Sequence, residues 1–274
     1  MALIPPIFLD AVVAVGFAGQ DGKAHYQATG LIYAQKQIDK NGKGYRVFIA
    51  TNRHVFEGKT KGFVRFNQES GESAREYELP LVDASGKPLW LAHQDPEIDV
   101  AVISINGQQL RKDGIRFACF LNDETVMPRS KAIEKGVSEG DGIFVLGFPF
   151  GLVGKGKNFV IVRQGVIATI RDCLEGDQKD FLIDCSIFPG NSGGPVVSRP
   201  EVVAIEGTKN ITRAYLIGIV AAYVPYRDVA INPQTGNARI IFEENSGLAS
   251  VFPVDYIEEL VAKASARQAE PAPT

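Results

Sequence analysis

The feature that most constrains the fold is a series of short runs rich in Val, Ile, Phe and Tyr, separated by Gly, Asn, Asp or Pro. An apolar period of 3.6 residues lasts ten residues almost nowhere, so the chain is expected to be all-β. Only segment 255–268 is expected to be helical, because its apolar residues recur at helix spacing. These residues are Tyr256, Ile257, Leu260, Val261 and Ala264.

The expected strands form two sets of similar size, which predicts two β-barrels with any functional site in the cleft between them. The strands are expected at 11–18, 26–34, 45–51, 62–67, 76–82, 88–92 and 100–105, then at 142–147, 159–170, 181–185, 195–203, 214–223, 229–242 and 248–253. The predicted domains are an N-terminal barrel at 8–110, a connection at 111–136, a C-terminal barrel at 137–254, a helix at 255–268 and a tail at 269–274.

Two segments are expected to be hairpin turns, because Gly, Asn and Pro supply the backbone dihedrals that tight turns need. They are Asn41-Gly42-Lys43-Gly44 and Asn232-Pro233-Gln234-Thr235-Gly236-Asn237.

The charge and the N-terminal segment limit the partners and the location. The 274 residues carry a formal charge of −3, so no nucleic acid and no anionic membrane is expected as a partner. No apolar run approaches the roughly 18 residues of a membrane span, and 1–6 lacks the basic start and continuous apolar core of a signal peptide. A cytoplasmic location is therefore expected, with a periplasmic one open if a leader has been removed.

The three cysteines, Cys119, Cys173 and Cys185, are widely spaced and include no Cys-x-x-Cys pair. Their odd number argues against a disulfide framework, and the lack of a nearby histidine argues against structural zinc. Free buried thiols in a reducing compartment are expected. No metal and no cofactor is predicted.

A serine turn flanked by glycines, Pro189-Gly190-Asn191-Ser192-Gly193-Gly194-Pro195, follows the apolar run 181–183. Glycine permits strained backbone dihedrals and a close approach of substrate to the main chain, both of which suit a nucleophile on a tight turn. The N–H groups of Gly190 and Ser192 could converge on a developing oxyanion. Taken alone, the turn is also consistent with an ordinary loop.

Three histidines are candidates for the general base that a serine nucleophile needs. His54 follows the expected strand 45–51, whereas His25 lies in a polar turn and His93 in a segment expected to be exposed. His54 is therefore the predicted base. Asp99 begins an apolar strand, where a carboxylate is expected to be buried and paired, so it is the predicted partner that fixes the imidazole tautomer.

Three segments together resemble the signatures of trypsin-like (chymotrypsin-fold) serine proteases: Thr51-Asn52-Arg53-His54-Val55, Asp99-Val100-Ala101-Val102 and Gly190-Asn191-Ser192-Gly193-Gly194-Pro195. The bacterial HtrA/Deg branch is the most similar, with further likeness at 142–152, 164–167 and 216–219. The resemblance covers 10–260. It implies two six-stranded antiparallel β-barrels of the chymotrypsin type with a C-terminal helix.

The resemblance also implies a serine endopeptidase with His54, Asp99 and Ser192 as its catalytic triad and the N–H groups of Gly190 and Ser192 as its oxyanion hole. The order of the residues is an independent check. Ser192 also fits the Gly-x-Ser-x-Gly pattern of α/β-hydrolases, in which the histidine follows the serine, but no histidine follows Ser192. Histidine, aspartate, serine is the order of the chymotrypsin-like template.

The chain departs from the family pattern at three places. Val55 stands where secreted relatives often have a cysteine, so a disulfide is missing there. Asn191 replaces the aspartate that pairs with a newly cut N-terminus in zymogen-type relatives, so activation by N-terminal cleavage is not expected. No peptide-binding PDZ module follows the helix, so a stand-alone protease or one half of a larger system is expected.

The resemblance places Ser186 at the base of the primary specificity pocket. Ser186 is not acidic and Ile187 lies beside it, so cleavage after small or medium apolar residues is expected. Gly218, Ile219 and Val220 are also expected to bind substrate, as a strand edge that pairs with an extended peptide. Plain strand-end packing of Ser186 and Ile187 is the alternative.

The expected partner is a polypeptide substrate, in unfolded or loop segments. The apolar segment 4–9 could mediate a homo-oligomer or could pack on its own barrel, and a regulatory partner protein is also open. Segments 148–151 and 154–157, the second of which carries two lysines, are a candidate mobile activation loop, with ordinary loop packing as the alternative. Two other functions remain open: a catalytically silent binding module on the same fold, and an esterase or acyltransferase that uses the same triad.

Overall fold

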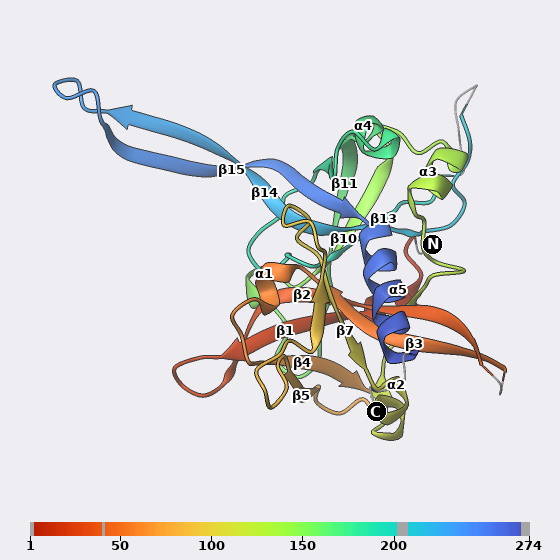
Figure 1. Ribbon diagram of the computed structural model, residues 1–274. Helices are drawn as coiled ribbons and strands as arrows, with labels where there is room; N and C mark the ends of the chain where they lie inside the picture. The colour runs from red at the N-terminus through yellow and green to blue at the C-terminus, as the bar shows by residue number, and fades with distance from the viewer. Residues whose placement is uncertain (1–2, 40–41, 202–207, 270–274) are drawn as a thin grey trace.

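The computed structural model describes residues 3–39, 42–201 and 208–269 and contains two β units that share one core (Figure 1). One buried apolar cluster includes Leu31 and Phe48 of the first unit and Phe144, Leu216 and Phe252 of the second. Because this cluster is continuous across the boundary, the two units hold fixed positions relative to each other.

The N-terminal unit is a curled sheet of nine strands. Strand order is β5-β4-β1-β2-β3-β7-β6, with β8 paired to β4 and β9 paired parallel to β2. The strands are β1 (Val12–Ala18), β2 (Ala24–Asp39), β3 (Gly42–Thr51), β4 (Lys61–Gln68), β5 (Arg75–Pro80), β6 (Trp90–Ala92), β7 (Ala101–Ile105), β8 (Ile115–Arg116) and β9 (Phe120–Leu121). The predicted pair of antiparallel β-barrels is confirmed, except that the first unit is a curled half-barrel rather than a closed barrel, because the edge strands β5 and β6 form no ladder with each other in the described residues. β6 has three residues, which pair with β7 on one side and end the sheet.

The C-terminal unit is a closed barrel of six strands, as predicted. Strand order is β10-β11-β12-β15-β14-β13. The strands are β10 (Gly142–Gly147), β11 (Ile161–Thr169), β12 (Phe181–Asp184), β13 (Pro195–Ser198), β14 (Leu216–Ile231) and β15 (Ala238–Pro253). Inward-facing side chains such as Ile143, Val145, Ile183 and Val251 fill the barrel and are almost fully buried.

The predicted C-terminal helix is confirmed as α5 (Asp255–Ala269). Ile257, Leu260 and Val261 are buried against the shared core, and the Tyr33 hydroxyl of β2 donates a hydrogen bond of 3.2 Å to Glu258. The helix therefore ties the end of the second unit to the first.

The expectation that only the C-terminus is helical was wrong. In the described ranges, six short helical segments precede α5: η1 (Pro6–Ala11), α1 (Arg53–Phe56), α2 (Gly107–Lys112), α3 (Arg129–Lys135), η2 (Pro149–Gly151) and α4 (Arg171–Glu175). Each is at most seven residues long, which is too short to display a 3.6-residue period. In η1, Phe8 is buried and its ring lies 4.8 Å from that of Phe120, so the N-terminal apolar segment packs on its own barrel.

The turn predicted at 232–237 is confirmed between β14 and β15, where the Asn232 N–H donates to the Asn237 carbonyl (2.9 Å). The other predicted turn, 41–44, begins at a residue that lies outside the described residues. β14 and β15 continue past the barrel and project into solvent as a long two-stranded arm (Figure 1).

Glu139 fastens the loop before β10 to the start of α4. Its carboxylate accepts hydrogen bonds from the N–H groups of Ile170 (3.0 Å) and Arg171 (3.2 Å) and from Arg171 Nε (2.9 Å). Desolvation raises the pKa of Glu139, but the hydrogen bonds that the carboxylate accepts outweigh it and lower the pKa to about 2. Because the pKa is lower in the folded chain, this stabilisation is complete above the unfolded pKa of 4.5 and is lost as the pH falls toward 2.

Glu139→Gln is therefore expected to lower the free energy of unfolding by about 1 kcal/mol near neutral pH, after allowance for solvent screening. The difference from wild type should shrink at about pH 3, because Glu139 of the unfolded wild-type chain is mostly protonated there while that of the folded chain is still ionised, and the carboxylate then stabilises the fold less. Urea unfolding of both proteins at the two pH values measures this. A difference that does not depend on pH would contradict the assignment.

Candidate active site

His54 and Asp99 form a pair at one end of the N-terminal unit. His54 lies in α1, just after β3, and Asp99 lies just before β7, which pairs with β3. Asp99 Oδ1 accepts the backbone N–H of His54 (2.9 Å), and Asp99 Oδ2 lies 2.5 Å from His54 Nδ1. The carboxylate therefore fixes both the backbone and the ring of the histidine, and leaves Nε2 free of this contact.

Neighbouring residues hold the pair in place. Ile98 and Val100, on either side of Asp99, are buried, and the buried Asn52 side chain donates to the Asp99 carbonyl (2.8 Å). The His54 side chain is 52% exposed and that of Asp99 25% exposed. The pair is thus rigid on its inner side, and the imidazole faces solvent.

The serine turn lies between β12 and β13 of the second unit and packs directly on the first. The Thr29 N–H of β2 donates to the Ser192 carbonyl (2.9 Å), and the Thr51 hydroxyl donates to the Thr29 carbonyl (2.8 Å). Thr51 precedes His54 by three residues. These contacts bring the turn to the segment that carries the histidine.

Gly193 is required for this approach. Its φ is +81°, and a Cβ at this position would lie 2.1 Å from the Thr29 carbonyl oxygen and 2.2 Å from the Thr51 hydroxyl. Any side chain here would push the serine turn away from the N-terminal unit. Ser192 itself is partly exposed.

No hydrogen bond joins the Ser192 hydroxyl to His54 in the described part of the chain. Hydrogen bonds between catalytic groups are often long and tighten only when substrate binds. The structure thus brings the serine turn and the histidine segment together through Thr29 and Thr51, rather than through a direct bond between the two side chains.

The backbone of the serine turn presents two N–H groups that donate no hydrogen bond within the described residues, those of Gly190 and Ser192. The intervening Asn191 N–H donates to Phe188 (3.0 Å), and the next two, of Gly193 and Gly194, donate to Val220 (3.0 Å) and Asn191 (2.8 Å). The two N–H groups without acceptors are the pair expected to face an oxyanion.

Phe150 fixes the orientation of the first of these groups. Its N–H donates to the Pro189 carbonyl (2.6 Å), and in a planar trans peptide the N–H of Gly190 points the opposite way from that carbonyl. Phe150 has a φ of +56°, the one non-glycine residue with positive φ in the described chain. Its ring lies 4.9 Å from that of Phe188. Sequence reasoning identified 148–151 as a loop but did not identify this hydrogen bond.

The predicted substrate-binding residues lie near the serine turn in different environments. Ser186 is exposed, whereas Ile187, Ile219 and Val220 are buried. Gly218 and Ile219 pair with β13 on one side and β15 on the other. Val220 donates its N–H to Gly194 and accepts from Gly193, so the backbone of this segment is already bonded within the barrel.

An ion-pair cluster joins the loop before Asp99 to the second unit. Lys179 Nζ lies 2.6 Å from the Asp95 carboxylate and 2.5 Å from that of Glu97. Hydrogen bonding to Asp95 and Glu97 raises the pKa of Lys179.

The other two histidines of the chain, His25 and His93, lie away from the serine turn. His25 pairs with Asp21 (2.9 Å), and His93, expected to be exposed, is instead mostly covered and pairs with Glu259 of α5 (3.2 Å).

All three cysteines are free thiols. Burial raises the pKa of each to about 11, so none is ionised near neutral pH and none is a nucleophile there.

Among the described residues, no cluster of three or more His, Cys, Asp or Glu side chains is suited to hold a metal ion. Within the same ranges, no helix has the length and apolar character needed to cross a bilayer.

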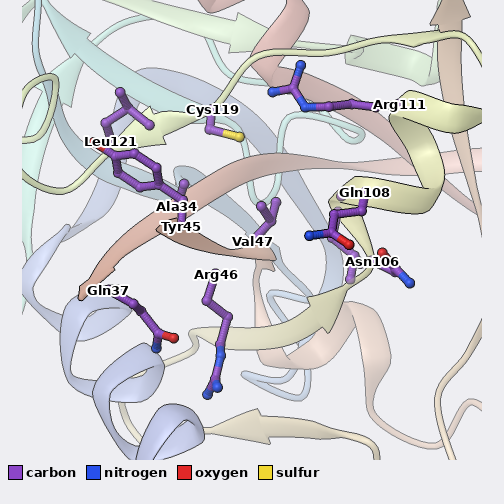
Figure 2. A pocket seen from close by; sticks show the side chains of 12 residues that line it. Ala34, Gln37, Tyr45, Arg46, Val47, Asn106, Gln108, Arg111, Cys119 and Leu121 are labelled. Atoms are coloured by element: carbon purple, nitrogen blue, oxygen red, sulfur yellow. The ribbon is translucent and has the colours of Figure 1, made fainter. Parts of the chain in front are cut away.

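A pocket of about 520 Å³ lies away from this site (Figure 2). Its lining comes from β2, β3, α2 and the segment around β9, and includes Tyr45, Arg46, Arg111 and Cys119. It contains none of the predicted site residues. The histidine, aspartate and serine turn are therefore the candidate site.

Comparison with known proteins decides the family. Residues 28–205 match the family described as trypsin-like peptidase domain. The chain belongs to the trypsin-like peptidase family. The matched range includes His54, Asp99 and Ser192.

Individual proteins that are similar to this chain agree with its assignment to the trypsin-like peptidase family. A probable periplasmic serine endoprotease, DegP-like, from Brucella suis is 27% identical over 174 residues, which are 61% of this chain and 30% of that protein. The serine protease Do-like HtrB from Bacillus subtilis is 26% identical over 172 residues, 60% of this chain and 30% of that protein. The chain thus spans about 30% of the length of these relatives. The first relative is named as periplasmic, so the comparisons lend no support to the expected cytoplasmic location.

A solved structure shares the trypsin-like fold. The structure of human heparin binding protein has a TM-score of 0.52 and 10% sequence identity, covering 100% of this chain and 98% of that one. At this identity the likeness bears on the fold alone.

Proposed function

We propose that this chain is a serine endopeptidase in which Ser192 is the nucleophile, His54 the general base and Asp99 the residue that orients the base. The observation that carries the proposal is the double hydrogen bond from the backbone and ring of His54 to Asp99. This histidine–aspartate pair lies beside the serine turn, which packs on the segment of the N-terminal unit that carries His54.

The reaction follows from this arrangement. Ser192 Oγ attacks the peptide carbonyl carbon and passes its proton to His54 Nε2, while Asp99 stabilises the imidazolium through Nδ1–H. The N–H groups of Gly190 and Ser192 bind the oxyanion. His54 then gives the proton to the leaving amine, and water hydrolyses the acyl-enzyme.

The substrate proposed is an unfolded or loop segment of a polypeptide, cut after a small or medium apolar residue. Ser186 brings no negative charge to the specificity pocket, and Ile187 beside it is apolar. Because Gly218, Ile219 and Val220 are already paired on both sides, an added substrate strand has to begin one residue further along β14, at Ala221. The three buried residues then support the wall of the cleft rather than pair with the peptide.

Digestion of unfolded casein, followed by mapping of the new chain ends, tests this function. The proposal predicts internal cleavage after small or medium apolar residues. Simple esters turned over in the absence of any peptide cleavage would favour an esterase, and acyl transfer to added amines in preference to water would favour an acyltransferase. No reaction with either substrate would favour a silent binding module.

Phe150 offers a test of the oxyanion hole. Phe150→Pro removes the N–H that the Pro189 carbonyl accepts and is incompatible with the positive φ, so the Gly190 peptide is expected to lose its orientation. Removal of one oxyanion donor lowers kcat about 10²- to 10³-fold. A decrease in kcat of this size is expected for Phe150→Pro. Phe150→Gly keeps the N–H and tolerates the positive φ, so it should stay within several-fold of wild type.

Steady-state kinetics on a peptide substrate distinguishes the two variants, with circular dichroism to verify that both are folded. If Phe150→Pro is folded and retains wild-type kcat, Phe150 does not position the oxyanion donors.

A further inference from the structure

The arm formed by β14 and β15 has no partner in the rest of the described chain. It consists of 226–231 on β14, the turn 232–237 and 238–244 on β15. β13 pairs with β14 only as far as Ile219, and β12 pairs with β15 only from Leu248 onward. Beyond these points the two strands pair only with each other, and Figure 1 shows them standing clear of both β units.

Large apolar side chains lie on both faces of the arm. Side chains alternate between the faces of a strand, and directly opposite residues share a face. The register therefore places Tyr226, Ile240 and Phe242 on one face and Val229, Ile231 and Ile241 on the other. All six are exposed, Val229 by 42% and Ile231 and Ile241 by 60%.

An arm of this kind is unfavourable if it stays in water. A two-stranded hairpin without a third strand or a packed face is at best marginally stable, and contiguous exposed apolar surface is rare outside interaction sites. Near its base, the Arg227–Glu243 ion pair (3.0 Å) and the hydrogen bond from Tyr223 to Glu243 (3.0 Å) fix the two strands in register. The register is thus specified locally, but the apolar faces remain uncovered.

The charges of the arm argue against a membrane or nucleic acid as the occupant. Segment 225–245 carries two cations, Arg227 and Arg239, and three anions, Asp228, Glu243 and Glu244, a net charge of −1. Anionic lipids and phosphates require a cationic surface. A mixture of both signs is self-complementary, because an antiparallel second arm can place opposite charges beside each other.

The area and the presence of two apolar faces favour a second copy of the chain. The six exposed side chains offer on the order of 600 Å², which is most of the roughly 800 Å² that each partner buries in a standard interface. A groove on an unrelated protein would cover only one of the two apolar faces of the arm. A second copy supplies an identical arm for one face and an exposed apolar surface of its own for the other. That surface, here called the body patch, consists of Val162 and Val166, which are both exposed and share one face of β11.

We propose that the arm is a dimerisation element that packs against a second copy of this chain. One face of each arm lies against the partner's arm, and the other lies against the partner's body patch. Each contact then occurs twice about a two-fold axis, which closes the assembly and leaves no arm free. This proposal does not depend on the catalytic roles proposed above.

Sedimentation equilibrium tests the proposal, performed on the Ser192→Ala background so that self-cleavage cannot remove the arm. One chain has a mass of 29.7 kDa, and the expected result is a mass of two chains in the micromolar range. Ile231→Ser combined with Ile241→Ser should raise the dissociation constant at least tenfold. The matched control, Gln234→Ser, changes an exposed uncharged residue in the turn of the same arm and should leave the mass unchanged.

A second pair of variants keeps the test decisive if the serine substitutions unfold the arm. Val162→Ser combined with Val166→Ser alters only the body patch and should also weaken association. The proposal is overturned if the parent protein stays at 29.7 kDa at every concentration, or if both variant pairs keep the mass of two chains. A third outcome would also overturn it: the chain stays monomeric, and the arm variants made in the active enzyme raise KM for long polypeptides. The arm would then bind substrate rather than a second copy of the chain.

Discussion

Ser192→Ala is expected to reduce hydrolysis of casein and peptides to the background rate. The substitution removes the only oxygen proposed to form the acyl-enzyme and leaves the turn intact, because the contacts to Thr29 and Thr51 use the Ser192 carbonyl and the Gly193 backbone. Removal of the nucleophile from such a triad costs on the order of 10⁶ in kcat. The residual activity comes from binding and the oxyanion hole.

The matched control is Ser85→Ala, which removes an exposed hydroxyl that bonds locally to Asp83 (2.6 Å). It should leave kcat unchanged. Both proteins are assayed after the same purification, so that a contaminating protease gives the same rate in each. Wild-type turnover by Ser192→Ala would refute the assignment of the nucleophile.

Asp99→Asn is expected to lower kcat by about 10⁴, with a much smaller change in KM. In the structure Asp99 accepts from both the backbone N–H and Nδ1 of His54. An amide can keep one of these contacts but presents an NH₂ group at the other position. Turned toward the ring, this group favours the tautomer with the proton on Nε2, which cannot accept the serine proton.

Asp95→Asn is the matched control for Asp99→Asn. Asp95 lies four residues earlier in the same loop, and its carboxylate is paired with Lys179 rather than with His54. A surface ion pair of this kind contributes at most about 1 kcal/mol, so kcat should change little. Equal losses in the two variants would indicate that the loop, and not the His54 contact, matters for activity.

The candidate site could be predicted from the sequence because each part of it is a short local pattern. The serine turn, the histidine after β3 and the aspartate before β7 are recognisable within about six residues each. Thr29 and Phe150 could not be found in this way. Thr29 lies in the middle of β2 with no flanking motif, and the Phe150 contact depends on a loop 39 positions before Pro189 that folds back on it.

The fold was predictable to a similar extent. The turn 232–237 is encoded by its own residues, so its position was correct. The length of the arm was not, because it depends on where β12 and β13 stop pairing with their neighbours, and those contacts are distant in sequence. The open N-terminal sheet has the same cause, since barrel closure requires pairing between strands far apart in the chain.

Labelling with a fluorophosphonate probe tests the central claim most directly, because the probe reacts with a serine only when a base and an oxyanion hole activate it. Folded wild-type protein is expected to take up one probe per chain, located at Ser192 by mass spectrometry. Denatured protein should take up none. If the folded protein remains unlabelled, or the adduct lies on another residue, Ser192 is not the nucleophile.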